Sequence, residues 1–307
     1  MNKKLLFIVN PRAGQMKAEK QLGGILEIFC GAGYLPTVFM TEYSGHAVEA
    51  AASCGADYDL VVCAGGDGTL NETITGLLNA GLRVPIAYLP CGTTNDLGTT
   101  LGLSRDIFEA AHTAVGEYSR ELDIGRFNYR NFVYTASFGA FTKASYTTPQ
   151  AMKNALGHLA YVLEGAKEVW SLKAVNARIK TDAGDFEGEY LFGSITNSTS
   201  LAGILTIDKS TVKLDDGLFE MMLVEKPANA LEYSKLLNQV LAKRFDDKLK
   251  LYKVSRVEIE TDEDLDWTLD GEQAVGKRRF VIQNLNRAVT IKVPIEAVKG
   301  DIAQYGK

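Results

Sequence analysis

Short apolar runs alternate with helically spaced apolar residues along the first 122 positions. Strands are predicted at residues 5–9, 37–40, 60–64 and 85–89, and helices at 18–29, 47–54, 70–78 and 107–115. A continuous apolar run is typical of a strand that is covered on both faces. The alternation therefore predicts an α/β domain with a parallel sheet and helices on its faces.

The pattern changes at Asp123. Strand-like runs follow at residues 132–141, 174–180, 190–196, 218–224, 254–260, 267–269, 280–282 and 289–293, many of them separated by turn signals such as Asp270-Gly271. This pattern is typical of a mainly antiparallel β-sandwich. Helices inserted in it are predicted at 152–170 and 228–245. We expect a domain at 1–122 and a second at 123–294, with residues 295–307 as a segment that could return to the first.

Length and charge narrow the classes of function. A chain of 307 residues fits two domains better than one core, and its net charge of −5 gives no basic field for nucleic acid. No run approaches the roughly 20 apolar residues of a transmembrane helix, and Asn10-Pro11 ends the first run too early for a signal peptide. The four cysteines have no metal spacing, which favours a reduced, cytosolic chain with buried thiols.

A glycine-rich loop, Gly65-Gly66-Asp67-Gly68-Thr69, joins a predicted buried strand to a predicted helix. Glycines let the backbone approach a ligand, and a helix N-terminus offers free N–H groups, so the loop suits a polyphosphate. Asp67 could hold Mg²⁺, but it could equally be the N-cap of a plain turn. Neither a dinucleotide glycine motif nor a P-loop is present, since Asp208 replaces the second glycine of the nearest P-loop-like stretch.

Two further loops follow predicted strands in the same half. They are Asn10-Pro11-Arg12-Ala13-Gly14 and Gly92-Thr93-Thr94-Asn95-Asp96. The carboxyl ends of parallel strands share one edge, where ligands bind. We therefore expect the three loops to meet at one crevice.

These three loops together resemble the diacylglycerol kinase catalytic-domain family, which includes bacterial soluble diacylglycerol kinases, related lipid kinases and sphingosine kinases. The resemblance continues through Thr196-Asn197-Ser198, the stretch at 213–219 and Asp270-Gly271-Glu272, and so covers nearly the whole chain. The bacterial diacylglycerol kinase branch looks closest. The resemblance implies the NAD-kinase/diacylglycerol-kinase-like α/β fold followed by a β-sandwich domain.

The resemblance also implies an ATP- and Mg²⁺-dependent kinase. Glu272 would be the general base, and Asp67 and Asp96 would lie around the ion. The residues implied to bind ATP are Asn10, Pro11, Arg12, Ala13, Gly14, Thr41, Gly66, Asp67, Gly68, Thr69, Leu70, Asn71, Glu72 and Thr93.

A second, structural Mg²⁺ is implied at the carbonyls of Lys213 and Leu218 and the side chain of Asp216. A plain Asp-Asp-Gly turn remains an alternative there. Likewise, Asp270-Gly271-Glu272 is also typical of a type I′ hairpin turn with a solvated glutamate.

The implied acceptor is diacylglycerol at a membrane surface, which would be converted to phosphatidic acid by a cytoplasmic protein bound peripherally to the inner face. The helix at 152–170 would be a lipid wall or a core element. Gln15 and Glu164 stand where bacterial relatives tend to carry basic residues, which would weaken docking on an anionic bilayer. Relatives are often dimers, so a homodimer is left open, although no motif marks an interface.

Several alternatives stay open. The acceptor could be another lipid, such as a sphingoid base, a glycolipid or a monoacylglycerol. NAD kinases also use a GGDGT loop and two domains, although Asn10-Pro11 and the loop at 92–96 favour a lipid kinase. A catalytically inert lipid- or nucleotide-binding protein is the alternative from another class, and the intact Asp67, Asp96 and Glu272 argue against it.

Overall fold

The computed structural model describes residues 3–15, 17–139, 173–198, 200–201, 205–206, 212–242, 245 and 248–298. The helix predicted at 152–170, and with it Glu164, lies outside them. The chain forms two compact units, one made of Met1–Leu122 with Arg287–Lys307 and the other of Asp123–Asn286. Strands β5 (Ser119–Phe127) and β15 (Glu272–Lys292) each run from one unit into the other. The chain therefore returns to the first unit at Arg287 rather than at 295.

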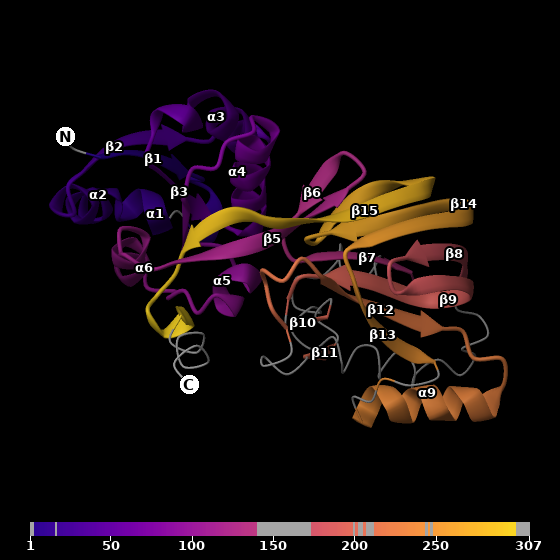
Figure 1. Cartoon of the computed structure of the whole chain (residues 1–307). Coiled ribbons are helices and arrows are strands. Elements are labelled where there is room, and N and C mark those ends of the chain that lie inside the picture. Colours follow the sequence, from indigo (N-terminus) through magenta and orange to yellow (C-terminus); the bar gives the residue numbers. More distant parts are fainter. Residues whose placement is uncertain are drawn as a thin grey trace, which may run out of the picture. The chain divides into compact units, whose positions relative to one another are not determined.

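The first unit contains a parallel sheet in the order β4-β3-β1-β2, of which β3, β1 and β2 are labelled in Figure 1. Its strands are β1 (Lys3–Val9), β2 (Tyr34–Met40), β3 (Leu60–Gly65) and β4 (Ile86–Pro90), and Ile291 near the end of β15 pairs with Ile86 of β4. The helices and 3-10 turns between them are η1 (Ala13–Gln15), α1 (Lys17–Lys20), α2 (Leu22–Gly31), α3 (His46–Cys54), η2 (Gly55–Asp57), α4 (Asp67–Asn79), α5 (Asp96–Thr100) and α6 (Ile107–Ala114).

Both faces of this sheet are covered, which explains its continuous apolar runs. On one face, alternate residues of β1, β3 and β4 pack against α2 and α6 in a single core cluster, where Phe7 and Phe29 meet edge to face at 5.3 Å. Helices α3 and α4 pack closely because Gly76 has no side chain; a Cβ there would lie 2.4 Å from the Val48 carbonyl oxygen. Cys63 and Cys91 are buried, but Cys30 is exposed, so the expectation of buried thiols is wrong for Cys30.

The second unit is built from antiparallel strands. They are β6 (Arg130–Phe132), β7 (Thr135–Gly139), β8 (Val175–Thr181), β9 (Gly184–Thr196), β12 (Phe219–Glu225), β13 (Leu249–Val254) and β14 (Arg256–Leu269), together with the second-unit parts of β5 and β15. The short β10 (Ser200–Leu201) and β11 (Leu205–Thr206) form a separate pair, and α9 (Ala230–Ala242) lies between β12 and β13 in the chain. The long strands β9 and β14 both pair with β8 through one half and with β7 through the other.

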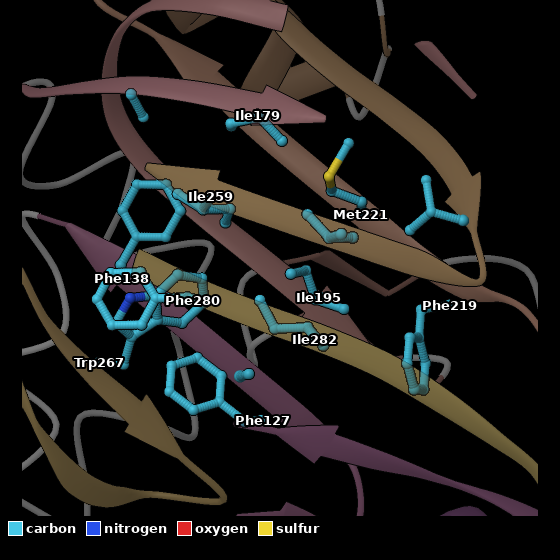
Figure 2. Close-up of a cluster of buried hydrophobic side chains, with 14 of the residues drawn as sticks. Phe127, Phe138, Ile179, Ile195, Phe219, Met221, Ile259, Trp267, Phe280 and Ile282 are labelled. Atoms are coloured by element: carbon cyan, nitrogen blue, oxygen red, sulfur yellow. The ribbon is translucent and has the colours of Figure 1, made fainter. Parts of the chain in front are cut away.

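The strands of this unit, apart from the β10–β11 pair, are joined by backbone pairing into one continuous sheet. Phe132 of β6 and Phe219 of β12 come from distant strands in the sheet order, yet their rings lie 5.6 Å apart. Trp267 is fully buried in the enclosed core and contacts Phe127, Phe138 and Phe280 (Figure 2). Within the described residues, no helix is long and apolar enough to cross a membrane.

Candidate active site

The first loop is fixed to the neighbouring strands by Asn10. The Asn10 backbone N–H donates to the Ala64 carbonyl at 2.9 Å, and its side-chain Nδ2 donates to Thr69 Oγ1 at 3.1 Å. Gly14 has a φ of 54° and lies so close to Cys91 that a Cβ would fall 1.8 Å from the Cys91 carbonyl oxygen. Only glycine satisfies both conditions, so the first loop is packed directly on the end of β4.

The glycine-rich loop and the loop after β4 also touch through their backbones. The Gly65 carbonyl accepts from the N–H groups of Cys91 at 2.7 Å and Gly92 at 3.1 Å. A Cβ on Gly92 would lie 2.7 Å from Gly66 Cα. The prediction that the three loops meet at one edge of the sheet is therefore confirmed.

Asn95 organises the third loop, and sequence reasoning missed its role. It is buried with a left-handed φ of 53°. Its Nδ2 donates to the Gly92 carbonyl at 2.7 Å, while its Oδ1 accepts from the Gly92 N–H at 2.9 Å and the Tyr88 hydroxyl at 3.0 Å. The available signal was the residue type, since asparagine tolerates the left-handed region better than most residues.

Asp67 is not an N-cap. Gly66 caps α4 and Asp67 is the first helical residue, so its carboxylate is directed to the neighbouring loop, where Oδ2 accepts the Asp96 N–H at 3.1 Å. Its Oδ1 is buried, and no hydrogen-bond partner for it lies within the described part of the chain. Burial raises the pKa of Asp67, although N–H groups of residues 95–97 oppose the shift.

Asp96 stands beside Asp67 in a similar environment. Burial raises the pKa of Asp96 to about 6, the Asp67 charge adds to the rise, and Arg105 opposes it. Two half-buried carboxylates, one with a buried oxygen that lacks a partner, are the donor set that a hard cation such as Mg²⁺ prefers. The first unit therefore fits a metal–polyphosphate ligand chemically.

The remaining predicted ATP-binding residues differ in what their side chains contact. Thr41 is buried and its N–H donates to the Val9 carbonyl at 2.8 Å. Glu72 Oε1 accepts from Ser44 Oγ at 3.2 Å and Gly45 N–H at 2.8 Å, so it holds the loop before α3. Leu70 is buried in the core, which leaves only its backbone for a ligand. The others at the loop edge are half-buried or exposed: Pro11, Arg12, Ala13, Gly68, Asn71 and Thr93.

Two cations near the third loop were not singled out as site residues by the sequence. Arg105 Nη2 donates to the Thr94 carbonyl at 3.1 Å, and Lys17 Nζ donates to the Arg105 carbonyl. These contacts link α1, the third loop and the start of α6. They place positive charge next to Asp96, to which Arg105 is electrostatically coupled.

In the second unit, Asp270 and Gly271 form the tight turn between β14 and β15. Their φ angles of 49° and 87°, with Leu269 paired to Glu272, fit the type I′ hairpin turn. The Asp270 carboxylate accepts backbone N–H groups of Val133 at 2.6 Å and of Tyr134 and Thr135 at 3.0 Å each. This carboxylate thus ties the turn to the segment between β6 and β7, a role that sequence reasoning missed.

Glu272 projects from the same turn into solvent, with a side chain 66% exposed. Its Oε2 lies 3.4 Å from Nη2 of Arg130, and Nη1 of Arg130 donates to the Gln273 carbonyl at 3.2 Å. Arg130 therefore holds both the backbone and the carboxylate at the start of β15. Glu272 lies in the second unit, whereas Asp67 and Asp96 lie in the first.

The predicted structural-metal loop at 213–218 is held by buried Asp123. Oδ2 of Asp123 accepts the Gly217 N–H at 2.6 Å. Asp216 Oδ1 accepts the Leu218 N–H at 3.1 Å, and its Oδ2 lies 3.4 Å from Lys253 Nζ. Nearby Glu220 is 3% exposed, and burial raises its pKa to about 7. The described residues contain no cluster of three or more His, Cys, Asp or Glu side chains that could hold a metal ion, so the structural Mg²⁺ stays a prediction.

Comparison with known proteins places the chain in a family. Residues 4–127 match the diacylglycerol kinase catalytic domain, and residues 135–291 match the YegS C-terminal NAD kinase beta sandwich-like domain. A diacylglycerol kinase of Bacillus subtilis (strain 168) is 34% identical over 300 residues, covering 96% of this chain and 97% of its own. A diacylglycerol kinase of Staphylococcus aureus (strain MRSA252) is 33% identical over 307 residues, covering 98% and 96%.

Solved structures show the same fold. One described as a diacylglycerol kinase from Bacillus anthracis str. Sterne superimposes with a TM-score of 0.73 at 24% identity, covering 96% of this chain and 98% of its own. Another from the same organism gives a TM-score of 0.80 at 25% identity, with coverage of 96% and 97%. The matches to both domains, and identity above 30% over nearly the full length, establish that the chain belongs to the diacylglycerol kinase catalytic-domain family.

Proposed function

We propose that this protein is an ATP- and Mg²⁺-dependent lipid kinase that transfers the γ-phosphoryl group to the hydroxyl of diacylglycerol, giving phosphatidic acid. The observation that carries the proposal is the meeting of three backbone-packed loops beside Asp67 and Asp96. The packed loops bring backbone N–H groups and the N-terminus of α4 to one sheet edge, which suits phosphates, and the two carboxylates suit the accompanying cation. Family membership supports the same reaction class.

The first unit would bind the nucleotide. We assign this role to residues 10–14, Thr41, residues 66–72 and Thr93, with Leu70 acting through its backbone and Glu72 by holding the loop before α3. Asp67 and Asp96 would hold Mg²⁺ or its waters. When bound, the ion would offset the negative charge on the phosphate oxygens during transfer.

The second unit would prepare the acceptor. Glu272 would take the proton of the lipid hydroxyl at a carboxylate oxygen, which leaves the hydroxyl oxygen free to attack phosphorus. Its exposure supports this role because a base must reach a substrate, and Arg130 limits its motion. Lys213, Asp216 and Leu218 would hold a structural Mg²⁺ that stabilises this unit. The protein would act in the cytoplasm, peripherally at the membrane surface.

The test is transfer of labelled γ-phosphate to diacylglycerol in mixed micelles, beside ceramide, sphingosine, monoacylglycerol and NAD as acceptors. We expect labelled phosphatidic acid, and a loss of roughly 10²–10⁴-fold in kcat in Glu272→Gln with ATP binding retained. Asp185→Asn, an exposed acid on β9, is the matched control and should keep full turnover. Turnover on another acceptor alone would refute the choice of diacylglycerol, and wild-type rates in Glu272→Gln would refute the base.

A further inference from the structure

Strands β5 and β6 form a hairpin (Figure 1), and its turn carries an exposed aromatic residue, Tyr129. Tyr129 follows Asn128, which adopts a left-handed φ of 51° at the tip, and its side chain is 92% exposed. No other large hydrophobic residue in the described ranges is as exposed; the next is Leu231 at 69%. Single exposed apolar residues are common, so exposure alone carries no conclusion.

The neighbours of Tyr129 give the tip its chemical character. Two hydrogen bonds join Asn128 to Val281 of β15. The Asn128 N–H donates to the Val281 carbonyl at 2.8 Å, and the Val281 N–H donates to Asn128 Oδ1 at 2.9 Å. Val281 is itself 37% exposed. Lys277 Nζ lies 5.7 Å from the centre of the Tyr129 ring, within cation–π range. We call Tyr129, Lys277 and Val281 the hairpin-tip surface.

Three arginines near this surface are paired with acids. The acidic strand β14 is engaged by Arg278, which contacts Asp264 at 3.2 Å, and by Arg279, which contacts Glu260 at 3.1 Å. Arg130 contacts Glu272. Lys277 instead lies over an aromatic ring and presents its ammonium group beside exposed apolar atoms. An amphipathic aromatic ring next to a lysine is typical of residues that settle at a membrane–water interface.

The position of the surface matters for the proposed reaction. Tyr129 directly precedes Arg130, whose guanidinium contacts Glu272, so the tip and the assigned base belong to one local assembly. An acceptor dissolved in a bilayer reaches a base only if the surface around that base meets the bilayer. We propose that the hairpin-tip surface docks on an anionic lipid bilayer, with Tyr129 entering the headgroup region and Lys277 contacting acidic headgroups. This proposal rests on the proposed lipid-kinase function and names where that kinase meets its substrate.

The test measures binding of the full-length protein to sedimentable vesicles of phosphatidylcholine, with and without phosphatidylglycerol, in the absence of ATP. Lys277→Gln should weaken binding about five-fold on vesicles with phosphatidylglycerol, the equivalent of about 1 kcal/mol, and should reduce the dependence on salt. Tyr129→Ala should weaken binding to both kinds of vesicle, and Tyr129→Trp should restore it. Leu231→Ala and Lys180→Gln are matched exposed controls and should bind as the wild type does.

Wild-type binding in Tyr129→Ala and Lys277→Gln would overturn the proposal, as would equal weakening by the two controls or no binding by the wild type. Circular dichroism and urea unfolding report whether each variant stays folded. Turnover of a water-soluble, short-chain diacylglycerol by the wild type tests the kinase separately. Activity there together with insensitive vesicle binding would refute the docking surface alone, whereas inactivity on every acceptor would refute the proposed function.

Discussion

Replacing Asp270 should loosen the turn that carries Glu272. Its carboxylate accepts three backbone N–H groups, from Val133, Tyr134 and Thr135, and a hydrogen bond to a charged group contributes about 1.5–3 kcal/mol. Simple addition overestimates the loss because water can reach a half-buried turn. We therefore expect Asp270→Gly to lower the free energy of unfolding of the second unit by about 3 kcal/mol. Glycine accepts the φ of 49°, so this variant removes the carboxylate without adding backbone strain.

Two further variants separate the contributions. Asp270→Asn keeps one acceptor oxygen and tolerates the left-handed conformation, so it should cost roughly half as much. Glu272→Gln, two residues away and exposed, should change stability by less than about 0.5 kcal/mol. The assay is urea unfolding followed by tryptophan fluorescence, to which Trp170 and buried Trp267 both contribute, together with hydrogen exchange at residues 133–135. An unchanged urea midpoint and unchanged exchange at those three amides in Asp270→Gly would refute the reasoning.

Three other perturbations test the first unit and the metal loop. Gly14→Ala should abolish ATP binding in calorimetry and lower stability, because its Cβ would fall 1.8 Å from the Cys91 carbonyl oxygen; normal ATP affinity would contradict the loop packing. The pKa of Asp96 is raised to about 6, so its charged form lowers the folding stability above that pH, and this loss disappears as the pH falls toward 4. In thermal melts, Asp96→Asn should therefore stabilise the unliganded protein by about 1 kcal/mol at pH 8 and not at pH 4. Without nucleotide, Mg²⁺ should raise the wild-type Tm, whereas Asp216→Ala should melt lower and lose most of that response.

Elements with a strong local pattern were predictable from the sequence. The strands 5–9 and 60–64 and the helix 70–78 correspond to β1, β3 and α4 within a few residues, because each pattern reflects burial on defined faces. In contrast, most of the run 254–260 and the whole run 267–269 belong to one strand, β14, which begins at Arg256, while Val254 ends β13. The acidic residues between the two runs suggested that the strand was interrupted, but β14 pairs with β15 on both sides of a bulge there. Polar residues in this part of β14 indicate that the side chains are exposed to solvent, and they do not indicate that the strand ends.

For the candidate site, the sequence predicted where the loops lie but not all the contacts that hold them. The glycine loops could be placed at one sheet edge because parallel strands fix where their ends lie. The roles of Asn95 and Arg105 could not be read in the same way, since their partners are backbone carbonyls or amides whose positions depend on the folded loop. Nor could the N-cap alternative for Asp67 be decided, because one residue's shift in where α4 begins changes the role of its carboxylate.

Backbone-bound carboxylates recur in both units and explain why Asp-Gly sequences were ambiguous. Asp67 accepts the N–H of Asp96, and Asp123 accepts that of Gly217, 94 residues away. Asp270 accepts three N–H groups from a segment about 135 residues earlier. Asp67 and Asp270 look like turn residues from the local sequence, but their carboxylates bond to backbone groups of distant segments. The two acids of the Asp-Gly-Glu turn have different roles. Asp270 binds backbone N–H groups and so fixes the turn, and Glu272 remains exposed on that fixed turn. The base role proposed for Glu272 requires that combination, because freedom to reach a substrate is useful only when the position of the carboxylate is constrained.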